Sequence, residues 1–239
     1  MRYMQIFIVG TGRSGTHWIG HILDAHPDIR ITIETPRIFR TATQAAIRPK
    51  RRSMLLPVLR GMYIAQTIRS KPHHYADKSH PIIWYADQVA QWFPKAKFIG
   101  LDRTPFGTVA SMLKHDHVSQ WQQDWKRYGI PNDFLGVTQE NAADYETMNP
   151  AQRAALRWVS HSDQMKRLEA ELGEKLLVIN YEGMVDNYDA GLERLWSFLS
   201  LRHMPVEPHR PKSSSRDGWR TALTPSQVAE ISAITGVVA

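Results

Sequence analysis

The 239-residue sequence has no cysteine, which excludes disulfides, thiolate catalysis and cysteine metal sites. Its eleven histidines form no H-E-x-x-H motif, so no metal site is expected. No apolar run approaches the ~20 residues that span a membrane. The first apolar run starts at residue 4 and leaves no room for a signal peptide, so we expect a cytoplasmic protein. No linker or internal repeat interrupts the chain, which predicts a single domain over residues 1–239.

Acidic residues are outnumbered, because 30 Lys and Arg face 23 Asp and Glu and the formal net charge is +7. This surplus favours an anionic partner. The basic residues are dispersed apart from residues 48–52, Arg-Pro-Lys-Arg-Arg, which we interpret as a solvated loop. By charge alone, nucleic acid, an anionic membrane and a small polyanion all qualify, but no long basic stripe for nucleic acid is evident. Our expectation for the partner is neither nucleic acid nor a membrane. The sequence makes no prediction of oligomeric state.

The first twenty residues carry the clearest pattern. Residues 4–9 are a short apolar run with β-branched members, which predicts a strand buried on both faces. Residues 10–16, Gly-Thr-Gly-Arg-Ser-Gly-Thr, form a glycine-rich turn, and residues 17–23 have helical apolar spacing. A strand, glycine-rich turn and helix together present backbone N–H groups and a helix N-terminus to a phosphate. Arg13 adds a full charge, and Ser14 and Thr16 add hydroxyls.

This loop is close to the P-loop pattern G-x-x-x-x-G-K-[ST] but lacks its lysine, since Thr16 and His17 follow Gly15. In nucleotide triphosphatases that lysine reaches the terminal phosphates, so its absence argues against a kinase or ATPase. Many strand-to-helix turns are rich in glycine for steric reasons alone. The rest of the chain must therefore decide the function.

Apolar runs alternate with helical patterns along the chain, which predicts an α/β fold with a mainly parallel sheet. Further strands are predicted at 28–34, 97–101 and 176–179. Residues 75–80 are interpreted as a polar turn, and residues 116–148 as a short helix and loops that form a lid. Helices are predicted from residue 36, over 54–68, 82–93, 105–115, 150–173 and 192–199, and from residue 225.

Polar residues gather where the predicted strands end: the loop 10–16, Glu34, Arg103 and Tyr181. Open parallel sheets bind their ligands at the carboxyl ends of the strands. This gathering is more informative than any single motif, and it predicts one site at that edge.

These residues resemble the sulfotransferases that use 3′-phosphoadenosine 5′-phosphosulfate (PAPS). The resemblance covers nearly the whole chain through ordered motifs: residues 12–16, 77–79 (Asp-Lys-Ser), 103–105 (Arg-Thr-Pro) with Ser111, 181–182 (Tyr-Glu) and 219–225. Residues 23–27 (Leu-Asp-Ala-His-Pro) and Glu34-Thr35 look most like the branch that includes tyrosylprotein sulfotransferases and bacterial relatives. The sequence departs from the family at Thr104, commonly Asp, and at Gly218, often Lys, so Arg216 is expected to substitute.

The resemblance implies a three-layer, P-loop-like fold that binds PAPS without a metal and releases adenosine 3′,5′-bisphosphate (PAP). It assigns cofactor binding to Gly12, Arg13, Ser14, Gly15, Thr16, His17, Arg103, Ser111, Tyr181, Arg216 and Trp219. The physical pattern agrees, because the loop suits the 5′ end and Arg103 with Ser111 suits the 3′-phosphate. The plainer alternatives are an Arg103–Asp102 ion pair and a Trp219 that only packs the last helix.

The resemblance also implies the catalytic residues. Glu34 would be the general base, and Lys78 would contact the bridging oxygen of PAPS. Glu34 is otherwise a carboxylate at a helix start, and Lys78 an exposed lysine in a polar turn. His17 is a rival base by position, although we expect it to face the phosphates.

Arg37 and Arg40 share one face of the next predicted helix. The tyrosylprotein branch has two arginines near this place. They indicate a small-molecule or peptide acceptor that is anionic. Two other functions stay open: a P-loop-type nucleotide kinase, and a non-catalytic protein that binds anions on the same fold.

Overall fold

The computed structural model describes residues 3–212 and 214–239. Its strands form one parallel sheet in the order β2-β3-β1-β4-β5, with the strand that leads into the glycine-rich loop at the centre. The strands are β1 (Gln5–Gly10), β2 (Ile29–Ile33), β3 (His74–Lys78), β4 (Lys97–Asp102) and β5 (Leu176–Asn180). This arrangement confirms the α/β class with a parallel sheet and brings every strand's carboxyl end to one edge.

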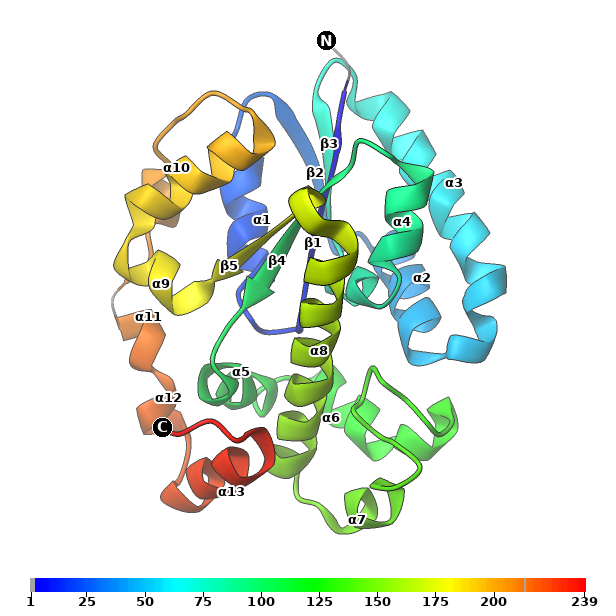
Figure 1. Ribbon diagram of the computed structural model, residues 1–239, viewed down its shortest axis with the longest axis vertical. Helices are drawn as coiled ribbons and strands as arrows, with labels where there is room; N and C mark the ends of the chain where they lie inside the picture. The colour runs from blue at the N-terminus through cyan, green and yellow to red at the C-terminus, as the bar shows by residue number, and fades with distance from the viewer. Residues whose placement is uncertain (1–2, 213) are drawn as a thin grey trace.

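Helices cover both faces of the sheet, as the predicted three-layer fold requires (Figure 1). In Figure 1, α1, α9 and α10 lie on one side of the strands and α2, α3, α4 and α8 on the other. The α-helices are α1 (Thr16–Asp24), α2 (Pro36–Ile47), α3 (Arg52–Ser70), α4 (Ala86–Trp92), α5 (Pro105–Met112), α6 (Asp116–Gln123), α7 (Ala142–Thr147), α8 (Pro150–Leu172), α9 (Tyr181–Asp186), α10 (Tyr188–Leu199), α11 (Ser214–Asp217), α12 (Trp219–Ala222) and α13 (Pro225–Thr235). Short 3₁₀ turns are η1 (Pro49–Arg51), η2 (His80–Trp84), η3 (Trp125–Tyr128), η4 (Gly173–Lys175) and η5 (Glu207–His209).

Strand β1 separates two hydrophobic cores by the alternation of its side chains. Phe7 and Val9 join the cluster beneath α2, α3, α4 and α8, whereas Ile6 and Ile8 join the cluster beneath α1 and α10. All four side chains are fully buried. The predicted burial of this strand on both faces is therefore confirmed, and the loop that follows it starts from a rigid support.

The prediction of a polar turn over residues 75–80 is wrong, because residues 74–78 are the inner strand β3. Its buried carboxylate, Asp77, accepts hydrogen bonds from the hydroxyls of Thr32 at 2.8 Å and Tyr63 at 3.1 Å. Burial raises the pKa of Asp77 to about 6, although these hydroxyls oppose the rise. A strand of polar sequence is thus accommodated in the sheet by polar partners from neighbouring elements.

Three predicted helices have different bounds. The one expected over 82–93 is split into η2 and α4 by Tyr85, whose hydroxyl donates to the carbonyl of Ala42 at 3.1 Å. The one expected over 105–115 ends at Met112, and the one expected over 192–199 begins earlier, at Tyr188.

Asn149 caps α8 through a capping box, and Thr224 caps α13 in the same way, so both predicted helix starts are confirmed.

Residues 116–148 contain α6, η3 and α7 joined by loops, as expected from their irregular pattern. Their action as a lid stays a prediction, as does the assignment of residues 1–239 to one domain. Across the described part of the chain, no helix combines the length and apolar character needed to cross a membrane.

Candidate active site

The glycine-rich loop joins β1 to α1 at the carboxyl edge of the sheet. Gly15 and Arg13 have positive φ angles of 105° and 78°. The N–H and hydroxyl of Ser14 both donate to the carbonyl of Thr11, at 3.1 and 2.7 Å, so both donors stabilise the loop itself. Gly15 is the N-cap of α1 and has no side chain to cap it, which leaves first-turn N–H groups for an anion. The role of Ser14 toward a ligand stays a prediction.

Two loop glycines are required by their neighbours. A Cβ on Gly15 would lie 2.7 Å from the ring of Tyr181, and a Cβ on Gly12 would lie 2.9 Å from Nε2 of His80. Tyr181 begins α9 at the end of β5 and is itself buried. The loop is therefore held by one residue that follows β3 and one that follows β5.

Glu34 follows β2 and meets three basic side chains. Its Oε1 accepts a hydrogen bond from Nζ of Lys78 and lies 3.4 Å from Nδ1 of His80, and its Oε2 lies 3.2 Å from Nε2 of His17. The N–H of Glu34 donates to the carbonyl of Lys78 at 3.1 Å, which places the two residues side by side at neighbouring strand ends. His17, expected to face the phosphates, contacts the proposed base instead.

The partners of Glu34 determine its protonation. Burial by itself disfavours the carboxylate, but the contacts with His17 and His80 and the charge of Lys78 hold the pKa of Glu34 far below its ordinary value. Lys78 is 1% exposed, and burial lowers its pKa to about 8 although Glu34 opposes the shift. The reading of Lys78 as an exposed lysine is therefore wrong.

His80 is a site residue that the sequence analysis missed. Burial lowers its pKa to about 3, so its imidazole is neutral at physiological pH. The only signal was its position just after Asp77-Lys78-Ser79, which was interpreted as part of a turn. Once β3 is recognised as a strand, His80 falls at the same sheet edge as Glu34.

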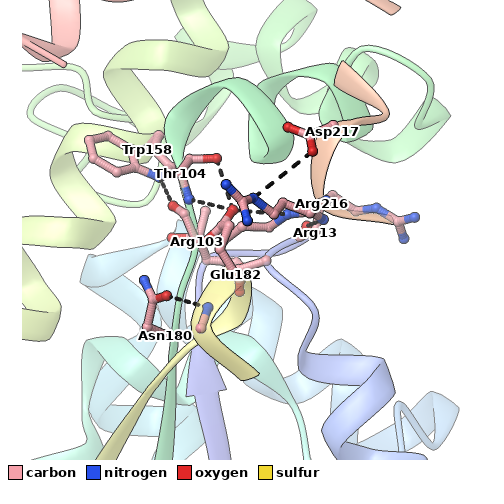
Figure 2. Close-up of polar contacts among 11 residues, drawn as sticks. Arg13, Arg103, Thr104, Trp158, Asn180, Glu182, Arg216 and Asp217 are labelled. Atoms are coloured by element: carbon pink, nitrogen blue, oxygen red, sulfur yellow. Dashed lines mark hydrogen bonds and ion pairs between the residues drawn. The ribbon is translucent and has the colours of Figure 1, made fainter. Parts of the chain in front are cut away.

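A second cluster joins the loop to the ends of β4 and β5 (Figure 2). Nε of Arg13 donates to Oγ of Ser111 on α5 at 3.1 Å, and Nη1 of Arg103 donates to the carbonyl of Arg13 at 3.3 Å. The Arg103 guanidinium lies over the ring of Tyr181, 4.1 Å from its centroid. The structure thus brings together four predicted cofactor residues from four separate parts of the chain.

The carboxylate of Glu182 lies beside this cluster. Its Oε1 is 4.0 Å from Nε of Arg103 and accepts hydrogen bonds from the N–H and hydroxyl of Thr104 at 3.2 and 2.9 Å. Thr104, where the family commonly has Asp, thus adds a hydroxyl hydrogen bond to Glu182. Burial and the charge of Glu182 raise the pKa of Asp102.

The late basic segment lies next to the second cluster. Arg216 donates to Oδ2 of Asp186 at 2.8 Å, and Figure 2 draws it near Arg103 and Glu182. Trp219 stacks on Phe106 with ring centroids 4.9 Å apart. This contact agrees with the packing role considered for Trp219, and its stacking on adenine stays a prediction, as does the substitution by Arg216.

The two predicted acceptor arginines lie outside the cavity next to Glu34. Arg37 and Arg40 are both exposed on α2. The cavity has a volume of about 220 Å³ and is lined by Gly12, Arg13, His17, Glu34, Phe39, Lys78, His80, His115, His117, Val118, Trp121 and Arg157. Arg157 is a second residue that the sequence analysis missed, because it sits inside an ordinary helical pattern.

The lining suits an anion that carries phosphate or sulfate. Arg13 and Lys78 supply cationic donors, and Gly12 keeps the cavity wall free of a side chain. Within residues 3–212 and 214–239, no group of three His, Asp or Glu residues is placed to hold a metal ion.

Fold and site together define a parallel α/β protein with a glycine-rich loop that lacks the kinase lysine and has a carboxylate–lysine pair beside it. The family described as "Sulfotransferase family" matches residues 5–205. The chain belongs to this sulfotransferase family. No curated protein matches the sequence.

Solved sulfotransferases share the fold. The sulfotransferase domain from the curacin biosynthetic pathway is 15% identical, with a TM-score of 0.62 over 100% of this chain and 99% of that one. A sulfotransferase from Alicyclobacillus acidocaldarius is 19% identical, with a TM-score of 0.56 over 99% and 97%. Mouse sulfotransferase SULT7A1, solved with PAP, is 17% identical, with a TM-score of 0.54 over 98% and 84%. At these identities the likeness is one of fold.

The contact between Gly15 and Tyr181 can be tested by substitution. Gly15→Ala puts a Cβ 2.7 Å from the Tyr181 ring at a φ of 105°, so the loop must shift. We expect PAP affinity, measured by calorimetry, to fall by roughly tenfold or more, a loss of about 1.4 kcal/mol or more.

Gly129→Ala is the matched control, since Gly129 also has a positive φ, 91°, but nothing lies within 4 Å of its Cβ position. This variant should lose stability alone and keep its PAP affinity. Wild-type PAP affinity in Gly15→Ala would show that the loop geometry does not bind the cofactor.

Proposed function

We propose that the chain transfers the sulfuryl group of PAPS to a hydroxyl or amine acceptor without a metal, with Glu34 as general base and Lys78 at the leaving phosphate. The observation that carries this proposal is the buried Lys78–Glu34 pair beside the glycine-rich loop. Family membership supports sulfuryl transfer, and the PAP bound in the mouse relative supports PAPS as donor. The absent P-loop lysine disfavours the kinase alternative.

The two clusters match the two anionic ends of PAPS. The loop N–H groups with Arg13 would hold the 5′ end, and Arg103 with Ser111 would hold the 3′-phosphate. The hydrogen bond from Arg13 to Ser111 links these two positions. Tyr181 supports both, since it packs on Gly15 and lies under Arg103.

PAPS supplies an activated sulfuryl group on a good leaving phosphate. The acceptor oxygen forms a bond to sulfur while the bond between sulfur and the bridging phosphate oxygen breaks, and the acceptor proton passes to Glu34. Lys78 would neutralise the charge that develops on the bridging oxygen. The products are the sulfated acceptor and PAP.

Lys78 also contributes to the strength of the base. The contacts with His17 and His80, and then the charge of Lys78, hold the pKa of Glu34 low, so the carboxylate is a weak base while all three are in place. When the ammonium group turns toward the leaving phosphate, Glu34 loses a cationic partner and its pKa rises. His17 and His80 stay in contact with the carboxylate and keep it oriented. One lysine thereby couples leaving-group stabilisation to base strength.

The acceptor is proposed as a small molecule or a peptide rather than nucleic acid. Arg37 and Arg40 would meet acidic groups of a larger acceptor at the outer surface of α2, as in the tyrosylprotein branch. The proposals on the acceptor and on the tyrosylprotein branch do not depend on the assignment of PAPS as the donor, and either can fail without it.

Cofactor use is tested by thermal melts with PAP and with ATP. PAP should stabilise the protein far more, because ATP has no 3′-phosphate for Arg103 and Ser111. At concentrations ~100-fold above Kd, PAP should add about 2.7 kcal/mol to the free energy of unfolding. Equal shifts from PAP and Mg²⁺-ATP would contradict the assignment and favour a kinase.

Glu34→Gln tests the base. The amide keeps the shape of the carboxylate but takes up no proton, so turnover of labelled PAPS should fall by roughly 10²–10⁴-fold. PAP affinity should stay near that of the wild type. Acceptor panels of phenols, sugars, lipids and peptides provide the turnover assay.

Glu182→Gln is the matched control at the other carboxylate of the sheet edge. It should change PAP affinity through Arg103 and leave turnover at saturating PAPS nearly unchanged. Near-normal turnover in Glu34→Gln would transfer the base role to His17 or solvent. Tight PAP binding by the wild type without turnover of any acceptor would favour the non-catalytic alternative.

A further inference from the structure

Arg157 is a buried arginine that lines the cavity of Glu34. It lies on α8, and its side chain is 1% exposed. Its Nε donates to the carbonyl of Phe134 at 3.2 Å, but its Nη1 and Nη2 have no hydrogen-bond partner among the described residues. The guanidinium lies 4.5 Å from the ring centroid of Phe134 and 5.3 Å from that of Trp121. Two aromatic rings therefore fix the unpaired fork in position.

The charge of Arg157 is not balanced by a carboxylate in this cavity. Three lining side chains are Lys or Arg, and the single carboxylate among the described lining residues, Glu34, is already in contact with Lys78, His17 and His80. Burial lowers the pKa of Arg157 to about 10, so it stays cationic at neutral pH. The nearby hydroxyl of Tyr145 stays neutral, because burial raises its pKa to about 12.

Arg153, one turn earlier on α8, is a structural arginine whose three guanidinium nitrogens all have hydrogen-bond partners. Its Nε, Nη1 and Nη2 donate to the carbonyls of Tyr145, Gln122 and Glu146 at 3.0, 3.0 and 2.9 Å. Arg157 has the same side chain on the same helix and lines the cavity, yet its two terminal nitrogens have no hydrogen-bond partner among the described residues. A buried donor without a partner is costly, which indicates that a ligand completes it.

The planar fork of arginine matches the two oxygens of a carboxylate. Three residues give the cavity apolar walls: Phe39, Val118 and Trp121. The cavity of about 220 Å³ exceeds the ~150 Å³ that accommodates benzene in an engineered protein core. We propose that the acceptor carries a carboxylate on a short apolar or aromatic body, with the carboxylate bound by Arg157 and its hydroxyl presented to Glu34. This inference rests on the proposed function, and it assigns the acceptor's anion to Arg157 rather than to Arg37 or Arg40.

The test uses matched pairs of acid and amide as probes. Binding of para-hydroxyphenylacetate and para-hydroxyphenylacetamide, and of para-hydroxybenzoate and its amide, is measured by calorimetry on the PAP-loaded protein. The wild type should bind the better acid roughly 10- to 100-fold more tightly than its amide, the range expected for hydrogen bonds to a charged group. If the wild type binds neither acid more tightly than its amide, the inference is wrong, and no variant is needed to show it.

Variants then locate the preference. Arg157→Gln should bring the acid-to-amide ratio close to one, and Arg157→Lys, which keeps the charge but not the fork, should retain only part of it. Arg153→Gln is the control: it loses three hydrogen bonds and some stability but should keep the full ratio. If Arg157→Gln does not fold, Arg157→Lys carries the comparison. An unchanged ratio in both would place the carboxylate elsewhere.

The same titrations separate this inference from the proposed function. PAP binding without an acid preference would overturn the inference and leave the function intact. If the protein does not bind PAP, the acid and amide titrations are made on the free protein, and an acid preference there would overturn the donor assignment alone. If Arg157→Gln weakens PAP as much as the acid, Arg157 belongs to the cofactor site and the inference is wrong.

Discussion

The pairing of Lys78 with Glu34 is the interaction on which the site depends. It requires β2 and β3 to be neighbours in the sheet, since Glu34 follows one strand and Lys78 ends the other. It also needs the surrounding burial, because the same pair in water would contribute little. Asp77, one residue before Lys78, anchors β3 through the hydroxyls of Thr32 and Tyr63, so the lysine is held by the core beneath it.

The rest of the edge is organised around charge. Arg13, Arg103 and Ser111 form one cationic cluster, and Lys78 and Arg157 face the cavity from other directions. Family membership accounts for sulfuryl transfer, whereas the open fork of Arg157 is a property of this chain's own side chains. In the proposed function, the cavity would combine a donor side built on the loop with an acceptor side built on α8.

The sequence predicted the parallel sheet and the glycine-rich turn at the end of its central strand, because buried apolar strands and glycine-rich turns are encoded locally. It failed at β3, where the polar residues 74–78 looked like a turn although partners distant in sequence satisfy them. Because β3 was not recognised as a strand, His80 was missed as a site residue and Lys78 was considered an exposed side chain, although it is buried. Arg157 could not be recognised either, because the sequence does not distinguish it from Arg153; only their hydrogen bonds in the fold do.

The central claim is that one buried lysine serves both the base and the leaving phosphate, and the titration of Lys78 by NMR tests it most directly. With side-chain-labelled lysine and Lys78→Met for assignment, Lys78 in the free protein should titrate near pH 8, well below the ordinary pKa of about 10.4. Glu34→Gln should lower this pKa further, since the carboxylate raises it, and PAP should raise it. An ordinary lysine pKa that neither Glu34→Gln nor PAP changes would contradict the account.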